Sequence, residues 1–292
     1  MQQFINITLS GLVEGMIYAA FALALVLIWR STRIVNFAQG SMAAATTFVA
    51  LALIDAGQSY WIAFAVALVS GFVLGAIVER VIIRPVEGGP ELNAVIVALG
   101  LFVALQALIA VIFGSSFQSF PTPFGVRGFE VGDTTIAITP TSLYIIGSVL
   151  IVMALLVALF RFTRIGLAMR ASAFSQEVSR LLGVRVGRML TLGWALAAVV
   201  GSLAGLLIAG GEFVYPAYMD SLIVFGFVAA VLGGLDSPVG AIVGGLLLGL
   251  ALSYVSGYID SALVNVAALV ILMIVLLVRP GGLFASSVAR RA

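Results

Sequence analysis

The chain has 292 residues, of which 63% are hydrophobic and 9% are charged, whereas a soluble domain carries about 25% charged residues. This composition excludes an ordinary soluble domain and predicts an integral membrane protein. The formal net charge is +2, and the basic residues, all of them arginine, form no patch with stacking aromatics, so we expect no nucleic-acid partner.

Cysteine, histidine and lysine are absent from the chain. Without the first two, thiolate chemistry and the commonest general base and metal ligand are missing. The sequence also shows no paired carboxylates and no Ser/Lys dyad, so we expect no catalytic, cofactor or metal site and disfavour an intramembrane enzyme. A phosphate-binding P-loop needs a lysine, so any ATP that drives this protein must be hydrolysed by another chain.

Apolar segments follow one another from end to end, and a membrane span needs roughly 20 such residues. The candidate spans are residues 8–29, 34–54, 60–78, 93–113, 141–160, 189–210, 221–235, 240–259 and 262–278. The seventh is short enough to be a tilted half-helix or a re-entrant segment. We therefore predict an all-α, polytopic transmembrane bundle of eight or nine spans in a single domain, residues 1–292. Because the first segment lacks a basic n-region, we interpret it as a retained span.

The arginines segregate between alternate loops. One set of loops holds Arg30, Arg33, Arg80, Arg84, the cluster of residues 161–188, and Arg279, Arg290 and Arg291 after the last span. Only Arg127 falls in the other set. Since cytoplasmic loops carry the excess of arginine, we expect the N-terminus outside and the C-terminus in the cytoplasm.

The loop of residues 161–188 contains six arginines and one acid, Glu177. Its apolar residues recur at helical spacing and predict one short amphipathic helix: Leu167, Ala171, Phe174, Val178, Leu181 and Leu182. Such a helix needs the membrane surface or another protein to cover its apolar face. The alternative interpretation is a solvated charge cluster that only sets topology.

The loop of residues 114–140 lies on the opposite, extracytoplasmic side and is rich in proline and phenylalanine. It is suited either to receiving a soluble partner or to covering the end of the bundle as a lid.

Within the spans, small residues recur every four positions, as in Gly193, Ala197, Gly201, Gly205 and Ala209. This spacing predicts helices whose backbones pack closely.

Three polar residues at membrane depth are candidates for lining a translocation path: Glu14, Asn36 and Gln39. Glu14 also lies near enough to its span's end to reach headgroup water, and the two amides are equally suited to holding helices together. A proton-coupled carrier usually keeps chains of buried acids or histidines. Their absence disfavours a stand-alone secondary carrier.

Three stretches together resemble one family. They are GLVEGMIYAAFALALVLIWRSTRIVNFAQGSMAAA (residues 11–45), TRIGLAMRASAFSQEVSRLLGVRV (residues 163–186) and VLGGLDSPVGAIVGGLLLG (residues 231–249), followed by a closing RPGGLF at residues 279–284. The chain resembles the permease subunits of branched-chain amino-acid ABC importers, the LivH-like branch. Ser41 departs from the acidic residue that the family often has after its Asn-Phe-Ala-x-Gly motif, and Val178 and Ser179 replace small residues.

The resemblance implies a type II ABC importer permease in a bacterial inner membrane. It further implies a related second permease subunit, two cytoplasmic ATPase subunits and an extracytoplasmic solute-binding protein. The segment 163–186 would contact the ATPase through motif positions Arg164, Gly166, Arg170, Glu177, Leu182 and Gly183, with Gly183 ending the helix. The expected solute is a branched-chain or related hydrophobic amino acid. The alternative is urea, a short amide or another small polar compound carried by the same architecture.

Overall fold

The computed structural model describes residues 1–86, 89–131 and 134–284. In this part of the chain, an apolar helix occupies each of the nine predicted segments. These helices are α1 (Gln2–Thr32), α2 (Gln39–Asp55), α3 (Tyr60–Ile77), α4 (Glu91–Phe113), α5 (Pro140–Phe162), α8 (Val186–Ala209), α9 (Asp220–Gly233), α10 (Pro238–Tyr258) and α11 (Val264–Val278). Seven are long and apolar enough to cross a membrane, while α2 and α9 are shorter. The seventh segment was predicted to be short, and the helix in the second segment is short as well.

Shorter elements connect these helices. α3 continues into a π-helical turn, η1 (Val78–Ile83), and a 3-10 turn, η2 (Arg84–Val86), and another 3-10 turn, η3 (Ser261–Leu263), precedes α11. Strand β1 (Gln118–Ser119) pairs antiparallel with β4 (Phe213–Val214), and β2 (Glu130–Val131) pairs antiparallel with β3 (Thr134–Thr135). The two remaining helices, α6 (Arg164–Phe174) and α7 (Gln176–Leu181), lie between α5 and α8.

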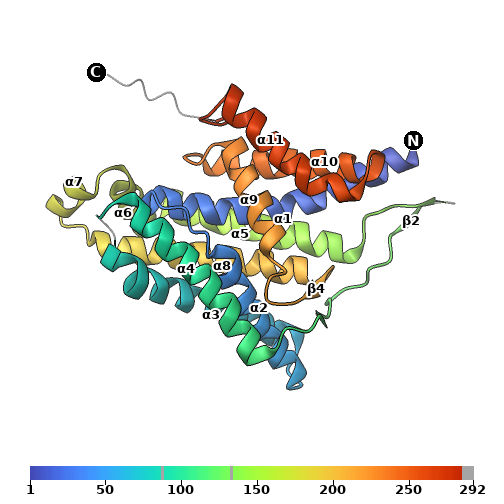
Figure 1. Cartoon of the computed structure of the whole chain (residues 1–292), viewed down its shortest axis with the longest axis horizontal. Helices are drawn as coiled ribbons and strands as arrows, with labels where there is room; N and C mark the ends of the chain where they lie inside the picture. The colour runs from blue at the N-terminus through green and yellow to red at the C-terminus, as the bar shows by residue number, and fades with distance from the viewer. Residues whose placement is uncertain (87–88, 132–133, 285–292) are drawn as a thin grey trace.

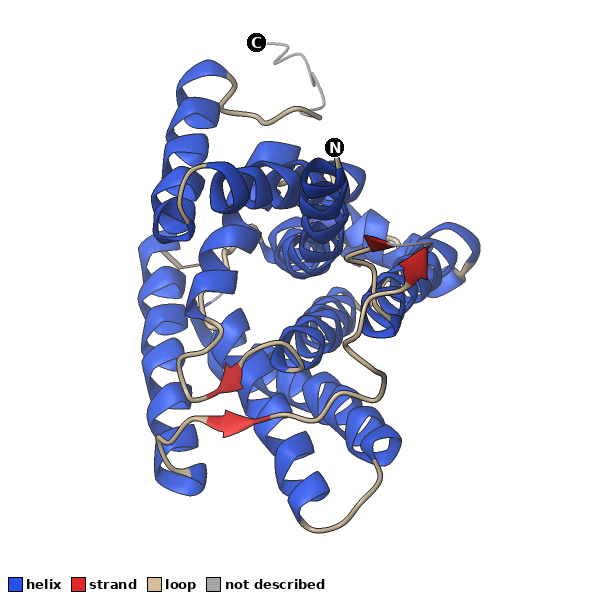
Figure 2. Ribbon diagram, turned by 90° about the vertical axis from the view of Figure 1, so that its right-hand side faces the viewer, coloured by secondary structure: helices blue, strands red, loops and turns tan. Residues whose placement is uncertain are grey.

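The bundle is elongated, and its two ends differ. Figure 1 shows α6 and α7 at one end and the N-terminus with strand β2 at the other. Figure 2 looks onto the N-terminal end, where both strand pairs lie. We call these the α7 end and the N-terminal end. The described residues of the loops 161–188 and 114–140 thus lie at opposite ends. Which of the two loops faces the cytoplasm stays a prediction.

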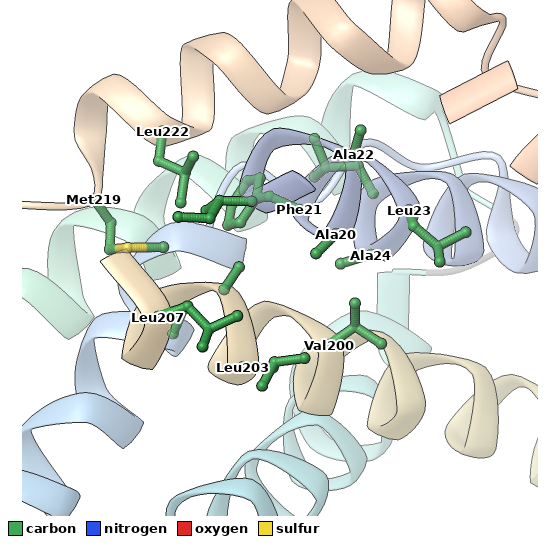
Figure 3. Close-up of a cluster of buried hydrophobic side chains, with 14 of the residues drawn as sticks. Ala20, Phe21, Ala22, Leu23, Ala24, Val200, Leu203, Leu207, Met219 and Leu222 are labelled. Carbon is green, nitrogen blue, oxygen red and sulfur yellow. The ribbon is translucent and has the colours of Figure 1, made fainter. Parts of the chain in front are cut away.

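Helix α1 forms the centre of the bundle. From Gly15 to Ile28 every one of its residues is buried, which is the pattern of a helix that is apolar all round and covered on every side. It packs against α10, α8, α9 and α5. Figure 3 shows Phe21 and its neighbours on α1 facing Val200, Leu203 and Leu207 of α8.

Glycines set the closest helix contacts. A Cβ atom on Gly249 of α10 would lie 2.3 Å from the Cα of Gly15 on α1, and one on Gly75 of α3 would lie 2.6 Å from the carbonyl oxygen of Trp194 on α8. Real side chains do not approach backbone this closely, so only glycine allows these contacts. The structure confirms the close packing predicted from the small-residue spacing.

An ion pair in the turns that follow α3, between Glu79 and Arg84, is hydrogen-bonded to the start of α8. The buried carboxylate of Glu79 accepts hydrogen bonds from the Arg84 guanidinium at 2.9 Å and from the Thr191 hydroxyl at 2.7 Å. Arg84 also donates to the carbonyl oxygen of Gly187 at 2.6 Å. This network fixes the position at which the loop 161–188 returns to the bundle.

Candidate functional site

A large polar cavity opens at the N-terminal end of the bundle. Its volume is about 740 Å³, and its walls come from α1, α5, α8, α9, α10 and α11, with η3 and the loops before α5 and between α8 and α9. The polar lining comprises Asn6, Ser10, Glu14, Tyr18, Thr139, Thr141, Glu212, Ser221, Ser253, Ser256, Ser261 and Asn265. Among the described residues, two carboxylates and no arginine line this outer cavity. It therefore has a negative potential that attracts cations and ammonium groups.

Glu14 lines the outer cavity from α1, where its carboxylate also has a side-chain hydrogen bond with Ser253 of α10. Tyr18, one turn later, places its hydroxyl 3.5 Å from a Glu14 carboxylate oxygen. The second carboxylate, Glu212, lies in the loop between α8 and α9, where burial raises the pKa of its carboxyl above the ordinary value. Of the three predicted path residues, Glu14 is the one that lines this cavity.

Asn36 and Gln39 lie elsewhere, fully buried where α2 meets α8. The Asn36 amide donates to the Gln39 side-chain oxygen at 3.0 Å, and the Gln39 amide donates to the carbonyl oxygen of Ala197 at 2.9 Å. Gly201 leaves the space that Gln39 fills. These contacts match the second interpretation of the two amides, which was to hold helices together.

The loop 161–188 contains two helices, so the prediction of one amphipathic helix was wrong. α6 ends at Phe174, and the extended backbone of Ser175 separates it from α7. The physical reason is capping. The Ser175 hydroxyl accepts from the amide of Val178 at 3.3 Å, and the Thr163 hydroxyl accepts from the amide of Gly166 at 3.0 Å.

An apolar surface remains uncovered on these two helices. It comprises Leu167, Phe174, Val178, Leu181 and Leu182, all of them exposed. Phe174 and Leu181 have relative exposures of 93% and 83%. We call this set the α6–α7 surface. A group of exposed apolar side chains in a loop outside the membrane-spanning helices indicates a binding surface.

The six predicted coupling residues occupy different environments. Arg164, Glu177 and Leu182 are exposed on or beside α6 and α7, as contact residues would be. Gly166 is buried: a Cβ there would lie 2.2 Å from the carbonyl oxygen of Leu159, so this glycine lets α6 fold back against α5. Gly183 has a φ of +81° and follows the end of α7, as predicted. Contact of this segment with an ATPase stays a prediction.

Arg170 points in another direction that sequence reasoning missed. With Arg30 of α1 it lines two cavities near the α7 end, of about 320 Å³ and about 40 Å³. The remaining walls are almost entirely apolar. Arg30 had been assigned only a role in topology, because a charge at the end of a span is the ordinary topological signal.

The loop 114–140 covers part of the N-terminal end. The Asn6 side-chain oxygen accepts from the amide of Ala137 at 3.1 Å, and Phe120 is buried against Tyr60. Thr139 and Thr141 line the outer cavity. The same loop leaves Phe117 exposed, in ring contact with Tyr215 at 4.8 Å. The loop thus covers the bundle and still presents an aromatic surface.

A bundle of apolar helices with a polar cavity at one end and an uncovered apolar surface at the other defines a multi-pass membrane permease. Residues 7–278 match the family described as "Branched-chain amino acid transport system / permease component". The chain belongs to this family, and its fold is that of a type II ABC importer permease. As a permease of ABC importers it works with ATPase and other subunits.

Characterised relatives match over nearly the whole chain. It is 30% identical to the high-affinity branched-chain amino acid transport system permease protein LivH of Escherichia coli, over 96% of this chain and 95% of that protein. It is 29% identical to the corresponding protein BraD of Pseudomonas aeruginosa, over 97% and 95%. These relatives are permeases, in agreement with the prediction that the chain is not an enzyme.

The fold also matches a solved structure, PsaBC from Streptococcus pneumoniae in complex with Fab. The TM-score is 0.51 at 17% sequence identity, over 94% of this chain and 91% of that one. At this identity the likeness shows a shared fold.

Proposed function

We propose that this chain is a membrane-spanning subunit of an ATP-driven importer for branched-chain or related hydrophobic amino acids in a bacterial inner membrane. The match to the branched-chain amino acid permease family over residues 7–278 carries this proposal. The N-terminus and the outer cavity face the outside, and the α7 end faces the cytoplasm. A related second permease subunit completes the pathway.

The two ends of the bundle suit the two kinds of partner. An extracytoplasmic solute-binding protein delivers the amino acid to the outer cavity, where Glu14 interacts with its ammonium group. Two ATPase subunits hydrolyse ATP and dock on the α6–α7 surface, whose apolar side chains become buried in the contact. Movement of α6 and α7 then drives alternating access.

Reconstitution tests the proposal. Proteoliposomes that contain the chain with its genomically neighbouring permease, ATPases and binding protein are expected to accumulate labelled L-leucine only when ATP is enclosed. Leucine uptake driven by an ion gradient with the chain alone would contradict the ATP-driven assignment. ATP-dependent uptake of urea or a short amide without leucine uptake would contradict the solute assignment.

Glu14→Gln tests the outer cavity. Removing the carboxylate removes a charge-assisted contact to ammonium, so we expect leucine uptake at limiting concentration to fall about tenfold. The control is Asp55→Asn, which changes an exposed carboxylate at the end of α2, outside the cavity lining. Equal leucine uptake by the two variants would show that Glu14 is not part of the translocation path.

A further inference from the structure

The inner cavity between α1, α5, α6 and α10 combines a cationic rim with an apolar wall. Its cationic residues are Arg30, Arg161 and Arg170. Its apolar wall comprises Leu23, Leu27, Met153, Leu156, Val157, Phe160, Pro238, Val239 and Ile242. None of the described residues that line it is a carboxylate, so it contrasts with the outer cavity, where both charged groups in the described lining are acidic.

No carboxylate in the described part of the chain forms an ion pair with a rim arginine. Among the described residues, ion pairs form between Arg33 and Asp236 and between Arg84 and Glu79, and neither includes a rim arginine. Asp236 interacts electrostatically with Arg30, but its carboxylate is already paired with Arg33. Guanidinium groups that lie beside an apolar wall and lack a carboxylate favour an anionic ligand.

A buried hydroxyl provides independent evidence for a ligand. Ser172 of α6 is 2% exposed, and its Oγ finds no hydrogen-bond partner among the described residues. It lines the small cavity that adjoins the inner cavity and shares Leu27, Arg30, Phe160 and Arg170 with it. An unsatisfied buried hydroxyl is costly, so a polar group that reaches this position would be stabilised.

The size of the cavity limits the ligand. At about 320 Å³ it lies at the lower end of the range for small-molecule sites, roughly 300–1,000 Å³. That volume suits a compact molecule rather than a whole phospholipid. The lining accommodates one anionic group near the arginines, one aliphatic group against the leucines and a further polar group near Ser172.

We propose that this inner cavity is a second solute site, in which Arg30 and Arg170 bind the carboxylate of the transported amino acid and the apolar wall holds its aliphatic side chain. The proposal rests on the proposed function. Ser172 accepts a hydrogen bond from the ammonium group or donates one to the carboxylate. The solute is thus recognised by its ammonium group at the N-terminal end and by its carboxylate at the α7 end.

Two analogues of leucine, each lacking one charged group, distinguish the contribution of its carboxylate from that of its ammonium group. The probe is labelled L-leucine bound to the purified complex with its partner subunits, in nanodiscs and without the solute-binding protein. The competitor 4-methylpentanoate keeps the carboxylate and branched chain but lacks the ammonium group, whereas leucinol keeps the amine and lacks the carboxylate. We expect 4-methylpentanoate to displace leucine and leucinol to compete at least about tenfold more weakly.

Three variants locate the site. Arg30→Gln and Arg170→Gln are each expected to weaken leucine binding about tenfold or more. Ser172→Ala, which removes one oxygen from a buried position, is expected to weaken it several-fold, about threefold to tenfold. The control is Arg188→Gln, an exposed arginine in the first turn of α8 that lines neither cavity. Each complex is first shown to keep the wild-type melting temperature and subunit composition.

The outcomes distinguish this proposal from the function on which it rests. Leucine import by wild type, with leucine binding unchanged in Arg30→Gln and Arg170→Gln, would overturn the inner site and leave the importer assignment intact. Leucinol competing as well as 4-methylpentanoate would overturn the carboxylate contact. Suppose that the wild-type complex imports no leucine but binds 4-methylpentanoate, and that Arg30→Gln weakens this binding. That result would contradict leucine as the transported solute and would still support carboxylate binding in the inner cavity.

Discussion

The ion pair between buried Glu79 and partly exposed Arg84 gives the first prediction at the scale of single residues. Glu79→Gln removes the negative charge while keeping the side-chain shape, so the guanidinium loses its counter-ion. Because water still reaches Arg84, we expect the loss of this charged hydrogen bond to cost about 1.5–3 kcal/mol. We expect a lower melting temperature in detergent, with a looser contact between α3 and α8.

Arg80→Gln is the control for this change. Arg80 lies in the same π-helical turn, is exposed, and forms no ion pair within the described residues. Its replacement is expected to leave the melting temperature unchanged. Equal destabilisation by the two substitutions would show that the Glu79–Arg84 pair contributes no more to stability than an unpaired charge in the same turn.

Sequence reasoning at this scale recognised residue types but not their partners. Arg84 was assigned a topological role, because nothing in the sequence shows that the π-helical turn directs it toward Glu79 and the start of α8. For the same reason the pathway and packing interpretations of Asn36 and Gln39 stayed open. The carbonyl of Ala197 that binds Gln39 is 158 positions away in the chain.

Helix packing gives the second prediction, at the scale of elements. Gly249→Ala would place a methyl group 2.3 Å from the Cα of Gly15 and force α1 and α10 apart. Overpacking of this kind costs about 1–3 kcal/mol. The matched control is Gly100→Ala in α4, where a Cβ meets nothing within 4 Å and is expected to be neutral or slightly stabilising. Thermal unfolding in detergent that ranks the two variants equally would contradict the packing argument.

The α6–α7 surface gives a third prediction. Leu181→Ala removes an exposed apolar side chain that a docked ATPase would bury, a loss of about 1.5–3 kcal/mol of binding free energy. We expect at least about tenfold weaker binding of the ATPase in a titrated pull-down. Leu277→Ala, at an equally exposed leucine on α11, is the control and should bind like wild type. Identical binding by both variants would place the docking site elsewhere.

The interruption between α6 and α7 shows where element-level prediction failed. Apolar spacing continues through residues 167–182 as if one helix were present, but Thr163 and Ser175 each act as an N-cap. Ser175 is followed by Gln176 and then Glu177 in the first turn, which is a recognisable helix start. The cap signal was present in the sequence, whereas the fold-back of α6 on α5 through Gly166 was not, because it depends on the position of Leu159.

At the scale of the whole molecule, the long spans were predictable because their apolar segments are long and clearly separated. The cavities were not, because each collects residues from helices far apart in the chain. The outer cavity joins Glu14 to Glu212, and the inner one joins Arg30 to Arg170. The partners of each cavity are far apart in the sequence, and they share an environment only when the helices assemble.

The sidedness of the molecule gives the last prediction, which the absence of native cysteine makes direct to test. Phe117→Cys, directly before β1, and Leu182→Cys, directly after α7, each introduce one thiol at an exposed position. The strand pairs lie at the N-terminal end and α7 at the other end (Figures 1 and 2). Because most arginines lie in loops assigned to the α7 end, we expect that end in the cytoplasm. A membrane-impermeant maleimide should therefore label Phe117→Cys in intact cells and Leu182→Cys only after permeabilisation. The reverse pattern would show the opposite topology and would contradict the assignment of the outer cavity to solute entry. Labelling of both thiols in intact cells would show that the two ends are not separated by the membrane.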